Sequence, residues 1–250
     1  MKKILFLTGA IFLLHTTQAQ LLKKVLGDKT DSSANNSGIL NNTFSKSTGG
    51  LNSNEIASGL KEALSIGAEK AGSSLSALNG FFGNAAIKIL MPDEAKKVEE
   101  KLRAIGLGDQ VDEAILSINR AAEDAAKSSV PIFVNAIKQM SIKNAAGILN
   151  GGDFAATEYL KDKTTAALTA SYKPVIEKSL EKVDATKYWN TFFTAYNKFA
   201  LKKINPDLTA YVTEKALAGI FYQVGQEEQK IRKDPLARGS DLLKKVFGGK

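Results

Sequence analysis

The sequence predicts an all-α fold, a multi-helix bundle of about seven to nine helices in a single compact domain or two packed lobes. Apolar residues recur at spacings of three and four over long stretches, and glycine or proline separates these stretches. No alternating run of apolar and polar residues indicates a substantial sheet. We expect the chain to divide into residues 1–19, 20–54 and 55–250, of which the last forms the helical domain.

The first helix of this domain is predicted from an apolar stripe that follows a capping residue, either Ser53 or Asn54. The stripe consists of Ile56, Leu60, Ala63, Leu64 and Gly67. Pro92, followed by two acidic residues, is predicted to begin a second helix. Proline fits the first turn of a helix, and acidic side chains complement the helix dipole there.

A third helix is predicted from a second stripe, and Pro131 is expected to kink or end it. This stripe consists of Val111, Ile115, Ile118, Ala122 and Ala125. Further helices are expected at residues 153–171, 175–183, 185–203 and 206–232. Gly151-Gly152, Pro174 and Pro206 interrupt the pattern between them.

Residues 1–19 have the layout of a secretory signal peptide. Lys2 and Lys3 precede an apolar run at 4–14, and small residues at 17–19 offer a cleavage point after Ala19. The run is shorter than the roughly 20 residues that a spanning helix requires. We therefore expect export, to the periplasm, with no lipid anchor because the chain has no cysteine.

Residues 20–54 are expected to hold a short amphipathic segment and a disordered polar tether. Of the 27 residues at 28–54, 18 are Ser, Thr, Asn or Gly. Before them, residues 21–27 read LLKKVLG, and residues 242–248 read LLKKVFG, so six of seven positions are identical. The repeat is a coincidence, a pair of segments that use one apolar groove, or a pair that binds an anionic membrane.

Composition excludes several kinds of chemistry. Cysteine is absent and the single histidine, His15, lies in the predicted signal peptide. Thiolate nucleophiles, histidine-based triads and metal sites with nitrogen or sulfur ligands are therefore excluded from the mature chain. We expect no metal, no cofactor and no catalytic residues.

Charge is concentrated at the C-terminus. Without residues 1–19, the chain has 32 basic and 26 acidic residues, a net charge of +6. Residues 230–250 contribute seven basic and two acidic side chains, or +5 of this total. A basic end on an exported protein favours an anionic lipid or envelope component as partner, and we expect no nucleic acid.

Five segments together resemble an uncharacterised bacterial exported family, catalogued as domain of unknown function 4197, over about residues 51–248. They are GLKEAL (59–64), NRAAEDA (119–125), AIKQMSIKNAAGILNGGDFAATEYL (136–160), YVTEKALAGIF (211–221) and EEQKIRKDPLARGSDLLKKVFG (227–248). The resemblance implies an exported helical domain and no particular activity. Family members usually carry aspartate at the position of Asn144 and near Ala218, so acid chemistry is not expected at either.

Two segments are candidate ligand sites. Gly151-Gly152 precedes a predicted helix that Asp153 can cap, and such a turn either joins two helices or binds an anion with free amides. An aromatic stripe at helical spacing either packs in the core or lines an apolar ligand cavity. It consists of Tyr188, Trp189, Phe192, Phe193, Tyr196 and Phe199, of which Trp189, Phe192, Phe193 and Tyr196 are our ligand-binding candidates.

Two groups of charged and polar residues are candidates for an interhelical ion network. The first consists of Asn119, Arg120 and Glu123, and the second of Glu227, Glu228, Arg232, Asp234 and Arg238. Small neighbours in the first group let another helix approach, which forces buried polar groups to pair. A catalytic carboxylate pair is the alternative.

These observations favour a non-enzymatic exported protein that binds an apolar or anionic envelope component or a protein partner. One alternative is a hydrolase that works with carboxylates. Another is a structural or assembly protein, a homo-oligomer whose copies dock through the LLKKV segments.

Overall fold

The computed structural model describes residues 51–182, 189, 193–194, 196–198, 203 and 207–248. Several predictions concern residues outside this set: the signal peptide, the LLKKVLG segment, most of the tether, and most of the helix at 185–203. The predicted all-α class is confirmed, because the described residues form helices and contain no strand.

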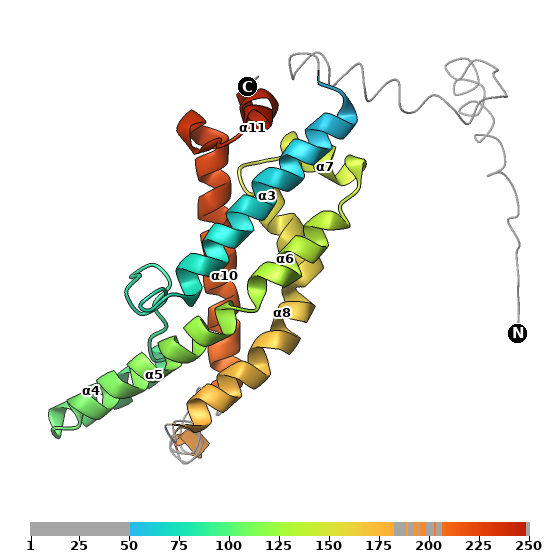
Figure 1. The fold of residues 1–250 in the computed structure, drawn as a ribbon. Coiled ribbons are helices and arrows are strands. Elements are labelled where there is room, and N and C mark those ends of the chain that lie inside the picture. The colour runs from blue at the N-terminus through green and yellow to red at the C-terminus, as the bar shows by residue number, and fades with distance from the viewer. Residues whose placement is uncertain are drawn as a thin grey trace, which may run out of the picture. The chain divides into compact units, whose positions relative to one another are not determined.

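Four long helices, α3, α5, α8 and α10, build the core of the described residues, and α10 contacts the other three (Figure 1). α8 also contacts α5 and α6, so residues from the whole described length share one apolar interior. None of the described helices is both long and apolar enough to cross a membrane. The elements are α3 (Ser53–Ser76), η1 (Asp93–Ala95), α4 (Lys96–Ala104), α5 (Gly108–Ala126), α6 (Ser129–Lys138), α7 (Ile142–Leu149), α8 (Ala155–Glu181), α10 (Leu208–Lys233), η2 (Pro235–Ala237) and α11 (Asp241–Gly248), where η marks a 3-10 turn.

The apolar stripes predicted for the first and third helices are buried faces of α3 and α5. The predicted cap of the first helix was wrong by one residue, because the N-cap is Asn52. Its Oδ1 accepts from the amides of Asn54 and Glu55, each at 3.0 Å, and Glu55 Oε2 accepts from the Asn52 amide at 2.9 Å. This reciprocal pair and the buried Leu51 place residues 51–54 in the helical domain, although we predicted them as tether.

Three of the prolines among the described residues have different roles. Pro92 precedes η1 and α4, as predicted. The prediction that Pro131 kinks or ends the third helix was wrong, because α5 already ends at Ala126 and Pro131 lies in the first turn of α6. Pro174 does not interrupt α8, so the predicted break there was wrong. Pro174 and Ala170, whose carbonyl loses its helical donor, are both exposed to water, while apolar residues on the opposite face are fully buried.

The C-terminal helix α11 packs on α3, as its amphipathic pattern predicts. Leu243, Val246 and Phe247 are buried, whereas Lys244 and Lys245 are exposed. Between α10 and α11 the chain turns through η2, which lies next to α11 at one end of the bundle (Figure 1).

Candidate functional site

Glu228 of α10, together with Arg232, joins α10 to the start of α8 and to the end of α7. Its carboxylate accepts from the amides of Ala156 at 3.0 Å and Thr157 at 2.8 Å, and from the Thr157 hydroxyl at 2.8 Å. Arg232, one turn further along α10, donates to Glu228 Oε1 at 2.9 Å and to the carbonyl of Ile148 at 2.8 Å. The pair therefore satisfies free amides at the start of α8 and adds a second donor to the Ile148 carbonyl at the end of α7, which also accepts from the Gly151 amide at 3.2 Å.

Glu228 has the capping role that we predicted for Asp153. α8 begins after Phe154, whose side chain makes no capping hydrogen bond, and Asp153 instead pairs with Lys233 at 3.2 Å on the surface. Gly151-Gly152 joins α7 to α8, which is the helix–helix turn given as one of the two alternatives for this segment. Because Glu228 already occupies the amides at the start of α8, they are not available to an anionic ligand.

Glu123 binds a loop in the same way that Glu228 binds a helix end. Its Oε1 accepts from the amides of Phe81 and Phe82, each at 3.1 Å, and its Oε2 pairs with Arg120 at 2.5 Å. Arg120 also donates to Asn79 Oδ1 at 2.8 Å, and Asn79 has a positive φ of 66°. The buried carboxylate thus fixes a strained turn between α3 and α4.

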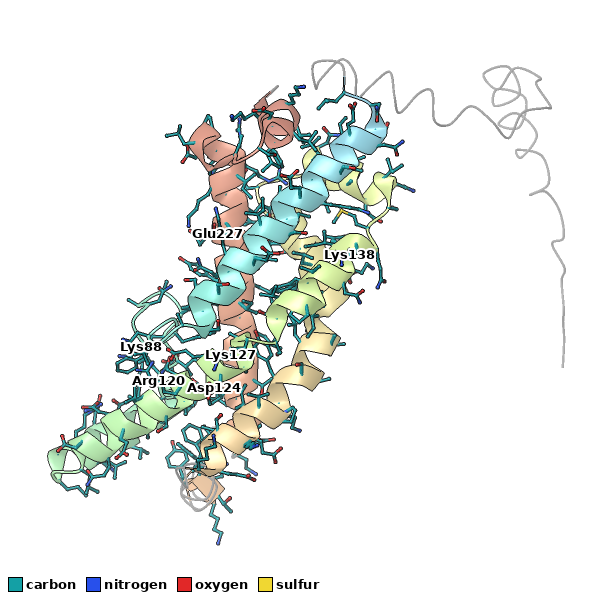
Figure 2. The ribbon with its side chains drawn as sticks, viewed as in Figure 1. Lys88, Arg120, Asp124, Lys127, Lys138 and Glu227 are labelled. Atoms are coloured by element: carbon teal, nitrogen blue, oxygen red, sulfur yellow. The ribbon has the colours of Figure 1, made fainter. Side chains whose placement is uncertain are left out.

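Asn119 fixes the other end of this loop. Its side chain accepts from the Ile89 amide and donates to the Ile89 carbonyl, both at 2.8 Å. Between these two points the Phe82 ring has the Lys88 ammonium 3.8 Å from its centre and the Arg120 guanidinium at 5.9 Å. Lys88 and Arg120 lie close together in Figure 2, which is consistent with a cation–π cluster on the loop.

The two charged groups do not form the joint network considered from the sequence. Glu123 binds the loop whose Phe81 ring packs against Gly219 of α10. Glu228 lies nine residues further along the same helix, about 13 Å away along its axis. Figure 2 also shows Arg120 and Glu227 well separated. Within the described part of the chain, every hydrogen bond and ion pair of each group stays within its own surroundings.

The remaining members of the second group have local partners. Glu227, buried against Gly67 of α3, pairs with Lys230 at 2.6 Å. Asp234 accepts from the Leu236 amide, and Arg238 donates to carbonyls at the end of α10. These contacts hold neighbouring elements together. Nor do the described residues gather three or more carboxylates that could hold a metal ion.

The structure brings three of the four aromatic candidates together, and Phe192 lies outside the described residues. Trp189 lies 4.3 Å from Phe193 and 5.9 Å from Tyr211, and Phe193 lies 6.3 Å from Tyr196, measured between ring centres. Tyr211 is the member that the sequence reasoning missed, because it comes from α10. Its hydroxyl donates to the Leu90 carbonyl at 2.7 Å, and burial raises its pKa to about 12.

The aromatic and glycine candidates do not share one site. Gly151-Gly152 precedes α8 and Trp189 follows it, and a helix of 27 residues is about 40 Å long. A cavity of ≈ 10 Å³ lies beside the Glu228–Arg232 pair, between Leu60, Leu64 and Phe247. That volume holds one water molecule at most.

The most distinctive surface feature is the segment 230–248, which we call the C-terminal tip. Leu236 is 94% exposed although it belongs to the ordered turn η2. Pro235 restricts the turn, Asp234 accepts from the Leu236 amide at 2.8 Å, and the buried Arg238 donates to the Ile231 carbonyl at 3.1 Å. Leu236 is therefore held outward by structure on both sides.

The C-terminal tip is also basic. Four of its lysines are exposed, whereas Arg232 and Arg238 are largely turned toward the protein. With Asp234 and Asp241, the described part of the tip carries six basic and two acidic residues, a net charge of +4. The exposed lysines are Lys230, Lys233, Lys244 and Lys245. The sequence reasoning noted the charge and missed Leu236, although a leucine after Asp-Pro at a helix end is a visible signal.

The fold and these contacts define an all-α bundle in which two buried carboxylates join distant segments. The family comparison agrees with the resemblance seen in the sequence. The chain belongs to the family described as "Protein of unknown function (DUF4197)", whose pattern matches residues 50–248. Comparison with curated proteins and with solved structures gave no match.

Proposed function

We propose that this protein is an exported, non-enzymatic binding module whose C-terminal tip docks on an anionic lipid surface. The observation that carries the proposal is Leu236, an ordered and almost fully exposed leucine within a segment of net charge +4. An exposed leucine favours a lipid layer over a soluble polyanion, because a lipid layer offers an apolar interior beneath its charged surface.

The leucine and each lysine make modest contributions of similar size to the free energy of binding. Burying one leucine side chain contributes about 2 kcal/mol. Each lysine close to an anionic bilayer contributes about 1 kcal/mol, and salt screens this part. The tip should therefore bind reversibly and require both components.

Vesicle sedimentation tests the proposal. With vesicles of one part anionic to two parts zwitterionic lipid, Leu236→Ser should lower the binding constant about thirtyfold, since the leucine contributes about 2 kcal/mol and 1.4 kcal/mol corresponds to a factor of ten. Lys244→Glu with Lys245→Glu should abolish binding, and added salt should weaken it. Purely zwitterionic vesicles should not bind.

Ile105→Ser is the matched control. Ile105 is 71% exposed and lies at the turn between α4 and α5, at the opposite end of the bundle from the tip (Figure 1). Its substitution should leave vesicle binding unchanged. Equal losses of vesicle binding in Leu236→Ser and Ile105→Ser would contradict docking through the tip. A loss of binding to a soluble polyanion in Leu236→Ser that is as large as its loss of vesicle binding would contradict a lipid layer as the partner.

A further inference from the structure

The loop between α3 and α4 presents apolar side chains to water. Leu78 is 76% exposed and Leu90 is 52% exposed. Three alanines of the loop are exposed as well: Ala77, Ala85 and Ala86. Between positions 77 and 91 the sequence has no acidic residue, and Lys88 is the only charged one. We call residues 77–91 the apolar loop.

Contacts with two helices fix the backbone of the apolar loop along its length. Glu123 accepts from the amides of two loop residues at 3.1 Å each, and Asn119 makes two hydrogen bonds of 2.8 Å with the backbone of Ile89. The Tyr211 hydroxyl donates to the Leu90 carbonyl at 2.7 Å. Because these contacts hold the loop in one conformation, its exposed leucine side chains stay outward, which is typical of a contact surface.

Cationic groups gather at the Leu78 end of the apolar loop. The Phe82 ring has the Lys88 ammonium 3.8 Å from its centre and the Arg120 guanidinium at 5.9 Å, and Figure 2 shows the two cations close together. Arg120 also donates to Asn79, the residue after Leu78, at 2.8 Å. An apolar side chain next to two cations suits a surface that is apolar beneath and anionic above.

The acidic groups of this region are either paired or lie at the other end of the loop. Glu123 is buried and faces the loop amides. Asp112 pairs with Arg103 at 2.6 Å, and this hydrogen bond, with a smaller effect of Lys88, holds its pKa below the ordinary value. Two further acidic residues, Asp93 and Glu94, follow the Leu90 end of the loop. The Leu78 end is therefore the one that fits an anionic partner.

The apolar loop lies on the same side of α10 as the turn that carries Leu236. In Figure 1 the loop between α3 and α4 and the turn after α10 both lie to the left of α10. The Phe81 ring of the loop packs against Gly219, which lies 14 residues before Lys233, or about 21 Å along α10. We propose that the Leu78 end of the apolar loop is a second contact with the anionic lipid surface, so that α10 lies along that surface between the loop and the C-terminal tip.

This inference rests on the lipid docking proposed above for the C-terminal tip, and it adds an orientation. Leu78 enters the apolar layer as Leu236 does, while Lys88 and Arg120 meet the anionic headgroups. Both contacts belong to one bundle whose helices pack together, so binding at the tip places the loop at the surface without a second encounter. A single contact would leave the bundle free to tilt.

Sedimentation of the full-length chain with vesicles of one part anionic to two parts zwitterionic lipid tests the second contact. Leu78→Ser should lower the binding constant about tenfold, and Lys88→Gln about fivefold with a weaker dependence on salt. Ile142→Ser is the matched control, since Ile142 is 43% exposed and begins α7, on the other side of α3 from the loop in Figure 1. It should leave binding unchanged, and circular dichroism should show all three variants folded.

The absence of cysteine allows single fluorescent labels to report which surfaces meet the lipid. An environment-sensitive fluorophore is attached at Ala77→Cys in the apolar loop, at Gly239→Cys in the tip, or at Lys143→Cys in α7, all exposed positions. On addition of the same vesicles, the emission should shift to shorter wavelength at positions 77 and 239. It should stay unchanged at position 143.

The label results separate this inference from the proposed function. A shift at position 239 without one at 77, together with normal vesicle binding by Leu78→Ser, would overturn the second contact and leave docking through the tip intact. An unchanged emission at position 239 would overturn docking through the tip and, with it, the arrangement of two contacts. Equal shifts at all three positions would overturn the orientation, because α7 would then meet the lipid as well.

Discussion

Replacing Glu228 by alanine should destabilise the protein far more than replacing a partly exposed glutamate in an ion pair of the same spacing. Glu228 and Arg232 are one turn apart in α10 and 2.8 Å apart, with side chains only 4% and 12% exposed. Removing one partner of a buried pair costs about 3–5 kcal/mol, because the remaining charge stays buried without a partner. The amides of Ala156 and Thr157 also lose their acceptor.

The matched control is Glu99→Ala. Glu99 and Arg103 have the same order and spacing and lie 2.9 Å apart, but their side chains are 23% and 37% exposed. An ion pair that water reaches on this scale contributes about 1 kcal/mol or less. We therefore expect the free energy of unfolding to fall about three times as much, or more, in Glu228→Ala as in Glu99→Ala.

Urea unfolding followed by far-ultraviolet circular dichroism measures both changes, and the slope against urea shows whether the transition stays comparable. The double variant Glu228→Leu with Arg232→Met should lose less stability than the sum of the two single changes, because no unpaired charge remains. Equal losses in Glu228→Ala and Glu99→Ala, or strict additivity in the double variant, would refute the assignment of Glu228 as the buried cap of α8.

Three further predictions concern other contacts. Gly219→Ala places a methyl group where the Phe81 ring lies and should lower the free energy of unfolding by about 1–3 kcal/mol. Gly147→Ala should raise it by about 0.5–1 kcal/mol, because a Cβ atom there meets nothing within 4 Å and alanine favours the helix. Thermal unfolding measures both changes. Glu123→Gln should speed protease cleavage between α3 and α4, and unchanged cleavage would contradict its role there. Burial raises the pKa of Tyr211 from its ordinary value of 10.0 to about 12, so its neutral form stabilises the fold fully below pH 10 and this contribution is lost toward pH 12. Tyr211→Phe should lose less stability over that range, and an identical pH dependence would show that Tyr211 is not responsible.

The spacing of apolar residues along the sequence determined the helices and their buried faces. Ile56 and Leu60 of α3, and Ile118 and Ala122 of α5, are buried as their spacing predicts, because a period of 3.6 residues places them on one side of a helix. Pattern also indicated that the C-terminal LLKKVFG would form a docked helix, since its apolar and basic residues separate onto two faces.

Tertiary structure alone decided what holds these helices together. Glu228 caps a helix that begins more than 70 residues before it, and Glu123 binds the amide of Phe81, 42 positions away. The small neighbours of Glu123 predicted that it would be buried and paired, but no local signal identifies its partner or the partner of Glu228, because these partners lie far away in the sequence. The same reason explains Pro174: burial of the opposite face of α8 offsets the hydrogen bond that proline removes, and that burial comes from helices elsewhere in the chain.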